Sequence, residues 1–243
     1  MNEKQIEEII ESRTGYIYLL RDNTAVKQLK DPSKVMEEYT IIKELYDKYK
    51  EKKREEWTYR AIKPLKVDQA GYLYMERAEG TPLICTMDEN PNLLRHAGIW
   101  LGFFHNMSKI NEDEYSLFKD PALSDVIIDE KNKIVIALDP GKKFGSSGLP
   151  EEDVVKFLIA LINFCLKRRS SPKKSIKIFL SGYYSVSDRK FQLDKYNSVF
   201  PKAFGKFLKT AKREKSKYGY CLYKLYFTIV EKLLKKILHK SFC

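Results

Sequence analysis

One stretch of this 243-residue chain, residues 118–141, constrains its fold more than any other. Two β-rich runs, at residues 126–128 and 134–138, flank the polar sequence Glu-Lys-Asn-Lys. Apolar runs of this length on either side of a polar turn predict a β-hairpin. Three carboxylates stand where the runs begin and end: Asp120, Asp125 and Asp139. A rigid hairpin would hold these acids at one cleft, which indicates metal and proton chemistry.

The rest of the chain is divided between strand patterns and helix patterns. β-rich runs predict strands at residues 15–20, 25–29, 61–67 and 71–75. Apolar residues at helical spacing predict helices at residues 35–46, 93–104, 154–165, 176–184 and 199–208. Residues 3–11 indicate a short polar helix or a lead-in strand, and the charged residues 48–56 indicate a solvated helix end. Strands that come mainly before helices predict an α+β chain, with a small sheet-containing lobe and a larger helical lobe.

The composition is that of a soluble globular protein, with 32% charged and 43% hydrophobic residues. Lys and Arg number 45 against 33 Asp and Glu, and residues 202–243 alone hold 12 basic and 2 acidic residues. The four cysteines show no Cys-x-x-Cys spacing, and no secretory leader pattern opens the chain. No apolar run approaches the ~20 residues that span a bilayer. We therefore expect reduced thiols and a cytoplasmic protein.

The spacing of the three acids resembles the catalytic segment of the protein-kinase-like superfamily, and it is most similar to the aminoglycoside phosphotransferase and choline kinase branch. In these enzymes a catalytic Asp is followed five positions later by a metal-binding Asn, then by a hairpin and the Asp of an Asp-Phe-Gly motif. The resemblance implies that Asp120 is the catalytic base and that Asp125 and Asp139 bind Mg²⁺.

Three departures from the family pattern accompany this resemblance. Phe118 and Lys119 stand in place of the family's His-Gly, Asp125 in place of Asn, and Pro140 in place of Phe. The first and the last of these favour a rival hypothesis, a catalytically inactive pseudokinase that serves as a nucleotide-binding or protein-interaction module, whereas the retained Lys27, helix Glu and three acids argue against it. A third hypothesis is a basic adaptor for membranes or nucleic acid with no nucleotide site.

The sequence Ala-Val-Lys at residues 25–27 resembles the kinase strand whose Lys reaches the nucleotide phosphates. Taken alone, Lys27 is also typical of an edge or surface lysine. The predicted helix that follows carries Glu38, which the resemblance implies as the partner of Lys27, with Glu37 as the second choice. Ser12 and Thr14 precede the first strand, where the family has its phosphate-covering loop. An ordinary strand entrance explains these two residues equally well.

The sequence from Met75 to Pro82 resembles the hinge that binds adenine in kinase-like folds. The resemblance implies Met75 as the gatekeeper and Glu76 and Ala78 as residues whose carbonyl or amide meets the base. A strand that ends at a Gly-Thr-Pro turn is the alternative.

Taken together, these matches imply a bilobal protein-kinase-like fold. Its expected parts are an N-terminal nucleotide-binding lobe at residues 1–79, a C-terminal catalytic lobe at residues 80–210 and a basic amphipathic helix at residues 211–243. The implied activity is transfer of phosphate from ATP, with Mg²⁺, to a hydroxyl of a small molecule or sugar. A lipid-linked or surface-glycan sugar is the expected acceptor if the last helix binds a membrane.

The last predicted helix keeps apolar residues at helical period while lysines occupy much of the rest. Such a helix can lie on an anionic bilayer, here the inner face of the membrane, or pack its apolar side on the catalytic lobe. Both alternatives stay open. No recognised nucleic-acid-binding motif supports the positive charge as a nucleic-acid site. His105 ends a predicted helix with no second His or Cys at ligand spacing, which favours a structural role over a base or ligand.

Overall fold

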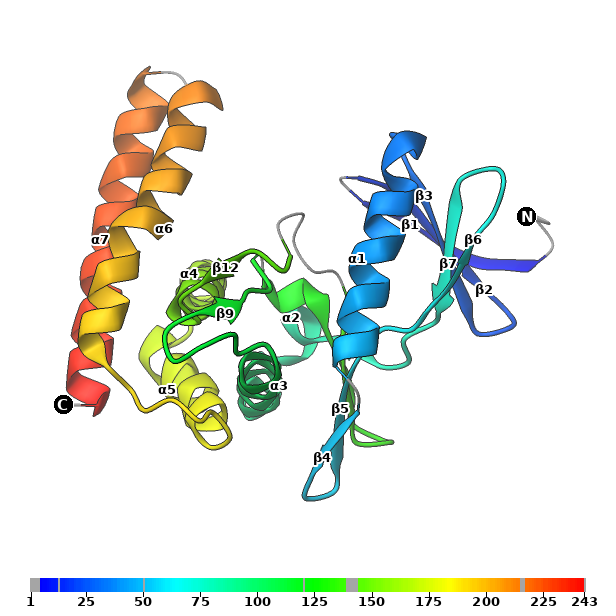
Figure 1. Ribbon diagram of the computed structural model, residues 1–243. Coiled ribbons are helices and arrows are strands. Elements are labelled where there is room, and N and C mark those ends of the chain that lie inside the picture. The colour runs from blue at the N-terminus through cyan, green and yellow to red at the C-terminus, as the bar shows by residue number, and fades with distance from the viewer. Residues whose placement is uncertain are drawn as a thin grey trace. The chain divides into compact units, whose positions relative to one another are not determined.

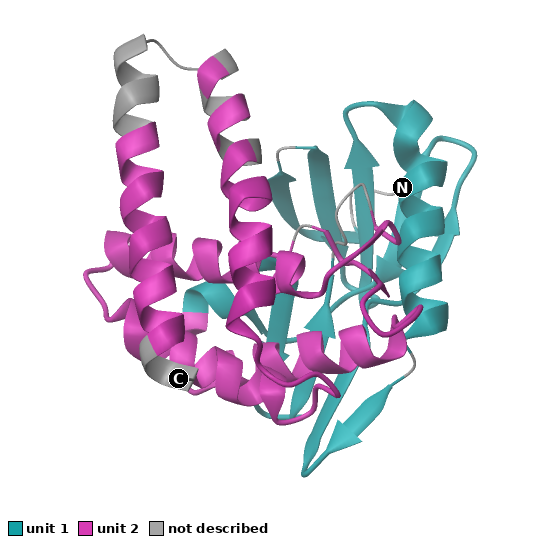
Figure 2. Ribbon diagram, turned by 60° about the vertical axis from the view of Figure 1, so that its left-hand side comes forward, with its two compact units in different colours: residues 1–85, 124–142 teal, residues 86–123, 143–243 magenta. Residues whose placement is uncertain are grey.

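The computed structural model describes residues 5–12, 14–49, 51–119, 121–138, 144–214 and 217–242. The chain forms two compact units, shown in different colours in Figure 2. Unit 1 comprises residues 1–85 and 124–142, and unit 2 comprises residues 86–123 and 143–243. The predicted division placed the segment 124–142 in the catalytic lobe, whereas its strands pair with those of unit 1. The roles assigned to the lobes stay predictions.

The first sheet of unit 1 is antiparallel, with the strand order β1-β2-β3-β7-β6 (Figure 1). Its strands are β1 (Ile6–Ser12), β2 (Gly15–Leu20), β3 (Thr24–Leu29), β6 (Pro64–Val67) and β7 (Tyr72–Glu76). Val26 and Leu73 are fully buried on neighbouring strands, as alternation on a half-buried sheet requires. The predicted strands at residues 15–20, 25–29 and 71–75 are confirmed, and of the two alternatives for residues 3–11 the lead-in strand is the one observed, as β1 from Ile6 onward.

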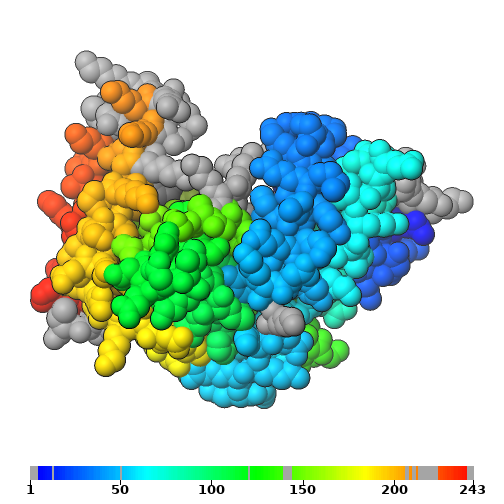
Figure 3. Space-filling view, in the orientation of Figure 1, coloured from blue at the N-terminus to red at the C-terminus, as the bar shows by residue number. Residues whose placement is uncertain are grey.

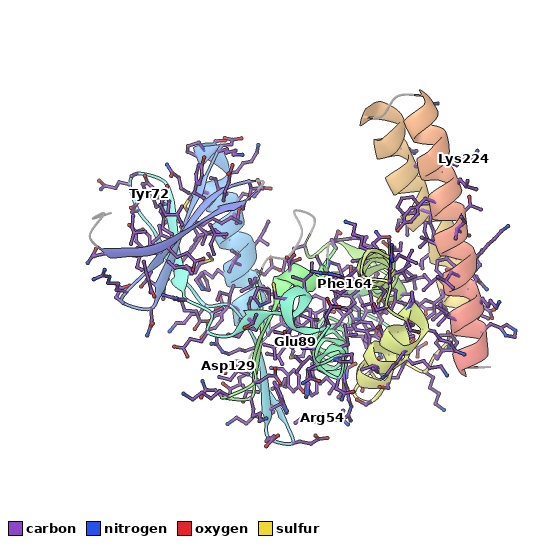
Figure 4. All side chains as sticks on the ribbon, turned by 180° about the vertical axis from the view of Figure 1, so that it is seen from behind. Arg54, Tyr72, Glu89, Asp129, Phe164 and Lys224 are labelled. Atoms are coloured by element: carbon purple, nitrogen blue, oxygen red, sulfur yellow. The ribbon has the colours of Figure 1, made fainter. Side chains whose placement is uncertain are left out.

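The second sheet of unit 1 has the order β4-β5-β11-β10-β8. Its strands are β4 (Lys52–Arg54), β5 (Trp57–Ala61), β8 (Thr81–Pro82), β10 (Val126–Asp129) and β11 (Ile134–Ala137). The predicted hairpin at residues 126–138 is confirmed as β10 and β11. β11 also pairs in parallel with β5, so this late hairpin is built into the N-terminal part of the chain. Figure 4 labels Arg54 at the end of β4 and Asp129 at the end of β10.

The prediction of a solvated helix end at residues 48–56 is wrong, because β4 lies within it and pairs with β5. β4 is the terminal strand of its sheet, and Lys52 and Lys53 are exposed. Charged side chains are tolerated on an edge strand, so a highly charged run such as this one can form a strand.

Helix α1 (Val35–Lys48) packs on unit 1 and presents its exposed side at the surface (Figure 3). Val35 and Ile42 join a core that reaches both sheets, with Leu73 from the first and Ile136 from the second. The amphipathic pattern of residues 35–46 therefore predicted this helix correctly.

Unit 2 is mainly helical, with α3 (Leu93–Met107), α4 (Glu151–Lys167), α5 (Pro172–Tyr184), α6 (Leu193–Glu214) and α7 (Lys217–Phe242). A short ladder joins β9 (Tyr115–Ser116) to β12 (Ser147–Gly148). Helices α3 and α5 approach closely: a Cβ added at Gly98 would lie 2.1 Å from the carbonyl oxygen of Phe179. Only glycine allows two helix backbones to come this near at that point.

Helix α7 lies beside α6 (Figure 1) and buries one face, which includes Phe227, Val230 and Leu234. Its opposite side exposes 59% of Leu225 and 54% of Ile229. The alternative in which the last helix packs on the protein is thus confirmed for one face, while the exposed face stays open to a partner. In the part of the chain that the structure describes, no helix is long and apolar enough to cross a bilayer.

Candidate functional site

A pocket of about 960 Å³ opens in unit 1 between the first sheet, α1 and the β10–β11 hairpin. Eight of the ten predicted site residues line it: Ser12, Thr14, Lys27, Glu38, Met75, Glu76, Ala78 and Asp125. The other two predicted residues, Asp120 and Asp139, lie outside the described residues. Residues separated by up to about a hundred positions in the sequence therefore meet at one cavity.

Lys27 projects from β3 and forms an ion pair with Glu38 of α1. The side chains are 7% and 19% exposed, respectively. A buried ammonium needs a charged or hydrogen-bonding partner, so the pair fixes the Lys27 amino group at the pocket wall. Glu37, the second choice, is exposed on α1. The nucleotide role of Lys27 and Glu38 stays a prediction.

The hydrogen bonds made by Glu76, the last residue of β7, limit which backbone groups of the predicted hinge can bind a base. The amide of Glu76 donates to the carbonyl oxygen of Lys63 at 3.0 Å, and its carboxylate accepts from the Lys63 amide at 2.7 Å and from Arg60. The amide of Glu76 is therefore occupied, and the predicted contact of Glu76 with a base, through its carbonyl or amide, stays a prediction. Among the described residues, no hydrogen bond engages the backbone of Ala78. Ala78 thus keeps the polar backbone groups that a base would need.

Gly80 allows the chain to leave the hinge beside β10. Its φ of +111° lies in the region that favours glycine, and an added Cβ would lie 2.5 Å from the carbonyl oxygen of Ile128. The resemblance implies a glycine at this position of the hinge. The close approach to Ile128 explains physically why a glycine is required.

Ser12 and Thr14 form the tight turn between β1 and β2 at the pocket. The Ser12 hydroxyl donates to the carbonyl oxygen of Gly15 at 3.0 Å and lies 3.4 Å from the Thr14 hydroxyl. The Thr14 carbonyl accepts from the Lys30 amide at 2.9 Å. These bonds stabilise the turn, as the strand-entrance alternative requires, and they also hold both hydroxyls against the pocket.

Asp125 lies at the end of a 3₁₀ turn (Leu123–Asp125) that leads into β10. Its carbonyl accepts from the amide of Leu138 at 2.8 Å, and its carboxylate accepts from Ser124 at 3.1 Å. Leu138 directly precedes Asp139, so the backbone leading to Asp139 is tied to Asp125. Carboxylate oxygens suit a hard divalent cation. Within the described residues, no group of three or more His, Cys, Asp or Glu could hold a metal.

In unit 2, Asp153 anchors the chain that leads to Asp120. It is fully buried, and its carboxylate accepts from the amide of Phe118 at 2.6 Å and the amide of Lys119 at 2.9 Å. These bonds hold the backbone of Lys119 at a φ of +75°, a strained conformation for this residue. This role of Asp153 was not predicted from the sequence. The available signal was an acid in the first turn of α4, and that position suggests helix stabilisation instead.

His105 completes this anchor from α3. Its Nε2 lies 3.4 Å from Asp153 Oδ2, and its Nδ1 lies 2.8 Å from the hydroxyl of Tyr183. A carboxylate only accepts, so Nε2 donates its hydrogen to Asp153, while Nδ1 and the Tyr183 hydroxyl share the second hydrogen bond. Burial raises the pKa of Tyr183 well above its ordinary value, which keeps that hydroxyl protonated. His105 therefore has the structural role that the sequence favoured.

Phe118, which the resemblance aligns with a His of kinase-like enzymes, is a packed aromatic ring. It is 1% exposed and meets Trp100 and Phe104 edge-on, at ring-centre distances of 5.1 and 5.6 Å. Such pairs stabilise beyond their buried area. Phe118 is thus well packed, which weakens one of the two reasons for expecting an inactive site. The other reason, Pro140, lies outside the described residues.

These features together define the protein-kinase-like fold: an antiparallel sheet and one helix joined by a Lys–Glu pair, followed by a hinge, an acid-bearing hairpin and a helical unit. The expected α+β architecture is confirmed, and solved structures of aminoglycoside phosphotransferases and of an amicoumacin kinase share it. The sequence matches no protein-family model and no curated protein.

Three solved structures show the extent of this likeness. Amicoumacin kinase hAmiN, in complex with AMP-PNP, Ca²⁺ and Ami, is 12% identical, with a TM-score of 0.57 over 96% of this chain and 89% of that chain. The GDP complex of aminoglycoside 2′-phosphotransferase-IIIa is 10% identical, with a TM-score of 0.58 over 99% and 95%. Aminoglycoside phosphotransferase APH(3″)-Id from Streptomyces rimosus is 12% identical, with a TM-score of 0.51 over 78% and 88%.

Proposed function

We propose that this protein is an ATP-dependent phosphotransferase that acts on a hydroxyl of a small molecule or sugar. The observation that carries the proposal is the buried Lys27–Glu38 pair, which lines the same pocket as Ala78 and Asp125. A fixed ammonium, the backbone groups of Ala78, which no described residue hydrogen-bonds, and a carboxylate in one cavity match the phosphates, the base and the metal of a nucleotide. Proteins of the same fold bind nucleotides with small-molecule acceptors, as in the complex of APH(3″)-Id with ADP and streptomycin.

In this mechanism the protein positions groups and neutralises charge. The acceptor oxygen bonds to the γ-phosphorus, the bond between that phosphorus and the β,γ-bridging oxygen breaks, and ADP leaves. Asp120 orients the acceptor hydroxyl and accepts its proton. Lys27 holds the α and β phosphates, while Met75 and Ala78 border the base. Mg²⁺, held by Asp125 and Asp139, would supply further positive charge at the phosphates.

The first test is thermal unfolding with ATP or GTP, each with and without Mg²⁺. A ligand that binds only the folded state raises the unfolding midpoint. We expect a Mg²⁺-dependent rise for the wild type and its loss in Lys27→Met. Lys30→Met is the matched control, because Lys30 directly follows the same strand, β3, and its side chain is exposed. Retention of the full shift in Lys27→Met would refute the assigned role.

A direct assay separates an active enzyme from a nucleotide-binding module. We expect Asp120→Ala and Asp139→Ala to abolish acceptor-dependent ADP release. Asp120→Ala should retain the nucleotide-induced shift, because Asp120 acts on the acceptor. Nucleotide binding that is unaffected by Mg²⁺, without turnover, would identify the pseudokinase instead.

We also propose that the exposed face of α7 contacts an anionic membrane surface. Leu225 and Ile229 are exposed there and are followed along the helix by Lys232 and Lys236. Lys224, labelled on α7 in Figure 4, directly precedes Leu225 in the sequence. Apolar side chains with flanking lysines suit an anionic interface.

Because the other face of α7 is buried, deletion of the helix would disturb unit 2, and point variants are the sharper test. Lys232→Glu with Lys236→Glu should weaken binding to vesicles of phosphatidylglycerol and phosphatidylcholine. Lys173→Glu with Lys174→Glu, two exposed lysines on α5, is the matched control. Equal vesicle binding by the two double variants would show that α7 does not contact the membrane surface.

A further inference from the structure

Four tyrosines share one side of the first sheet in unit 1. Directly opposed residues on neighbouring strands point to the same side of a sheet. Two such rows cross β2, β3 and β7: Tyr16, Gln28 and Tyr72 in one, and Tyr18, Val26 and Tyr74 in the other. We call this side of the sheet the tyrosine face; Tyr72 is labelled in Figure 4.

The tyrosine face is the side of the sheet that turns away from the pocket. On β3, Ala25 and Lys27 alternate with the residues of the tyrosine face, and both line the pocket. Glu38 of α1 meets Lys27 on that side. Helix α1 therefore packs on the pocket side of the sheet, and the tyrosine face is its other side.

The tyrosine rings are held in place by neighbours on the same face. The Tyr18 hydroxyl donates to Oε1 of Gln28 at 2.7 Å, and the Tyr74 hydroxyl donates to Oδ2 of Asp68 at 3.0 Å. Val26, which stands between these two tyrosines in its row, is 0% exposed. Because α1 packs on the opposite side, the rings supply its cover. Side chains that are already ordered lose little conformational entropy when a partner binds.

The tyrosine face also exposes aromatic and apolar surface. Tyr16 is 40% exposed, and Ile9, which pairs with Tyr18 at the edge of the sheet, is 57% exposed. Ordered aromatic side chains are enriched in protein interfaces. Five strands at ~4.8 Å spacing, with about five residues each at ~3.4 Å, give a flat area of roughly 400 Å². Because a standard interface buries about 800 Å² per partner, this face predicts weak association.

Opposite charges stand at the two edges of the tyrosine face. Glu11 of β1 pairs with Tyr16, Lys66 of β6 pairs with Tyr74, and both charged side chains are exposed. The Lys66 ammonium lies 5.0 Å from the centre of the Tyr74 ring. β1 and β6 are the two terminal strands of the sheet, so Glu11 and Lys66 lie about 19 Å apart at ~4.8 Å per strand. They are too far apart for an ion pair within one chain.

The charge of the chain is divided unevenly between its two units. Unit 1 holds 19 basic and 20 acidic residues, whereas unit 2 holds 26 basic and 13 acidic residues. Two copies of a chain with a net charge of +12 repel one another. The nearly neutral unit 1 is where this repulsion is weakest. Single-stranded nucleic acid also stacks on aromatic side chains, but it needs a positive groove, whereas the tyrosine face carries Glu11 and Asp68 beside Lys66.

We propose that the tyrosine face binds the same face of a second copy of this chain. A two-fold axis parallel to the strands sets each β1 opposite β6 of the second copy, so that Glu11 of each chain meets Lys66 of the other. The two sheets then stack about 10 Å apart with the tyrosines between them. Because the tyrosine face lies opposite the pocket, this inference is independent of the proposed function.

Sedimentation equilibrium of the full chain, from micromolar to millimolar concentration at constant ionic strength, tests the proposal. We expect the average mass of the wild type to rise toward that of two chains. Glu11→Lys and Lys66→Glu should each weaken association at least about tenfold, because two-fold symmetry creates two like-charge contacts per dimer. Glu37→Lys on α1 and Lys52→Glu on β4 make the same charge changes at exposed positions elsewhere and should leave association unchanged. A wild type that stays monomeric throughout would overturn the inference.

A mixture of Glu11→Lys with Lys66→Glu separates a contact between chains from a defect in folding. In the mixed dimer, one chain carries lysine at both positions and the other carries glutamate at both, so each edge again joins opposite charges. We expect the equimolar mixture to regain the association of the wild type. A mixture that associates as weakly as the separate variants would count against the proposed pairing of edges.

Tyr16→Ala tests the aromatic part of the face and the rival occupant together. It removes an exposed ring and leaves the hydroxyl bonds of Tyr18 and Tyr74 in place. We expect it to weaken self-association at least about tenfold, since each dimer loses two rings. Fluorescent oligothymidylate is titrated against both proteins, and we expect Tyr16→Ala to bind it as the wild type does. Loss of oligothymidylate binding in Tyr16→Ala, with self-association intact, would assign the face to nucleic acid instead.

Discussion

Replacement of Asp153 by Asn tests whether one buried carboxylate holds the loop that leads to Asp120. The substitution keeps the shape of the side chain, so no cavity forms. It removes the charge and places an amide NH₂ against one of two backbone donors, which lie 2.6 and 2.9 Å from the carboxylate in Phe118 and Lys119.

The expected cost follows from these contacts. Each hydrogen bond to a charged group contributes about 1.5–3 kcal/mol, and removing one partner of a buried charged set costs about 3–5 kcal/mol. We therefore expect Asp153→Asn to destabilise the protein by about 3–5 kcal/mol. For a chain of this size, that corresponds to roughly 6–20 °C in the unfolding midpoint.

Two measurements check this expectation. Urea unfolding gives the global loss, and hydrogen exchange followed at the amides of Phe118 and Lys119 gives the local one. Their exchange should accelerate by about a hundredfold or more, since 1.4 kcal/mol corresponds to a factor of ten. Asp188→Asn, at an exposed position, is the control and should change stability by less than about 0.5 kcal/mol. Unchanged protection of both amides in Asp153→Asn would refute the argument.

Two further predictions concern unit 1. Glu38→Gln removes the Glu38 carboxylate from the buried Lys27 ammonium, so it should cost about 3–5 kcal/mol in urea unfolding and abolish the nucleotide-induced shift, whereas Glu37→Gln should do neither. Gly80→Ala forces a Cβ to within 2.5 Å of the Ile128 carbonyl at a positive φ, so it should lower stability by about 1–3 kcal/mol; a stability equal to that of the wild type would show that the hinge relaxes freely.

Local patterns predicted most of the regular elements. Alternation and turn residues located β2, β3, β7 and the β10–β11 hairpin, because each signal lies within a few neighbouring residues. The same patterns missed β4, whose charged side chains are compatible with an edge strand, and they predicted α6 only over residues 199–208. The pairing of β11 with β5 could not be predicted either, because a parallel contact between residues more than seventy positions apart has no signal in the local sequence.

The contacts of the candidate site were likewise predicted only in part. Lys27 and Glu38 were predicted by resemblance, and the structure places them in contact. The occupied amide of Glu76 could not be foreseen, because its partner, Lys63, lies in the connection between β5 and β6, far from Glu76 in the sequence. The role of Asp153 was not predicted, because an acid in the first turn of a helix is usually explained by its interaction with the helix N-terminus. Its contact with Phe118 depends on tertiary packing.

The pairing of β11 with β5 has a consequence for how this protein can be made and divided. The chain passes between the two units three times, near residues 85, 123 and 142, so no single cut separates them. A fragment that ends at residue 85 would lack β10 and β11 and leave β5 and β8 with unsatisfied edges. During synthesis, the second sheet cannot close until the ribosome has released residue 137, and the first unit must wait for part of the second. Any attempt to isolate the pocket should therefore join residues 124–142 to the N-terminal segment through a designed connection.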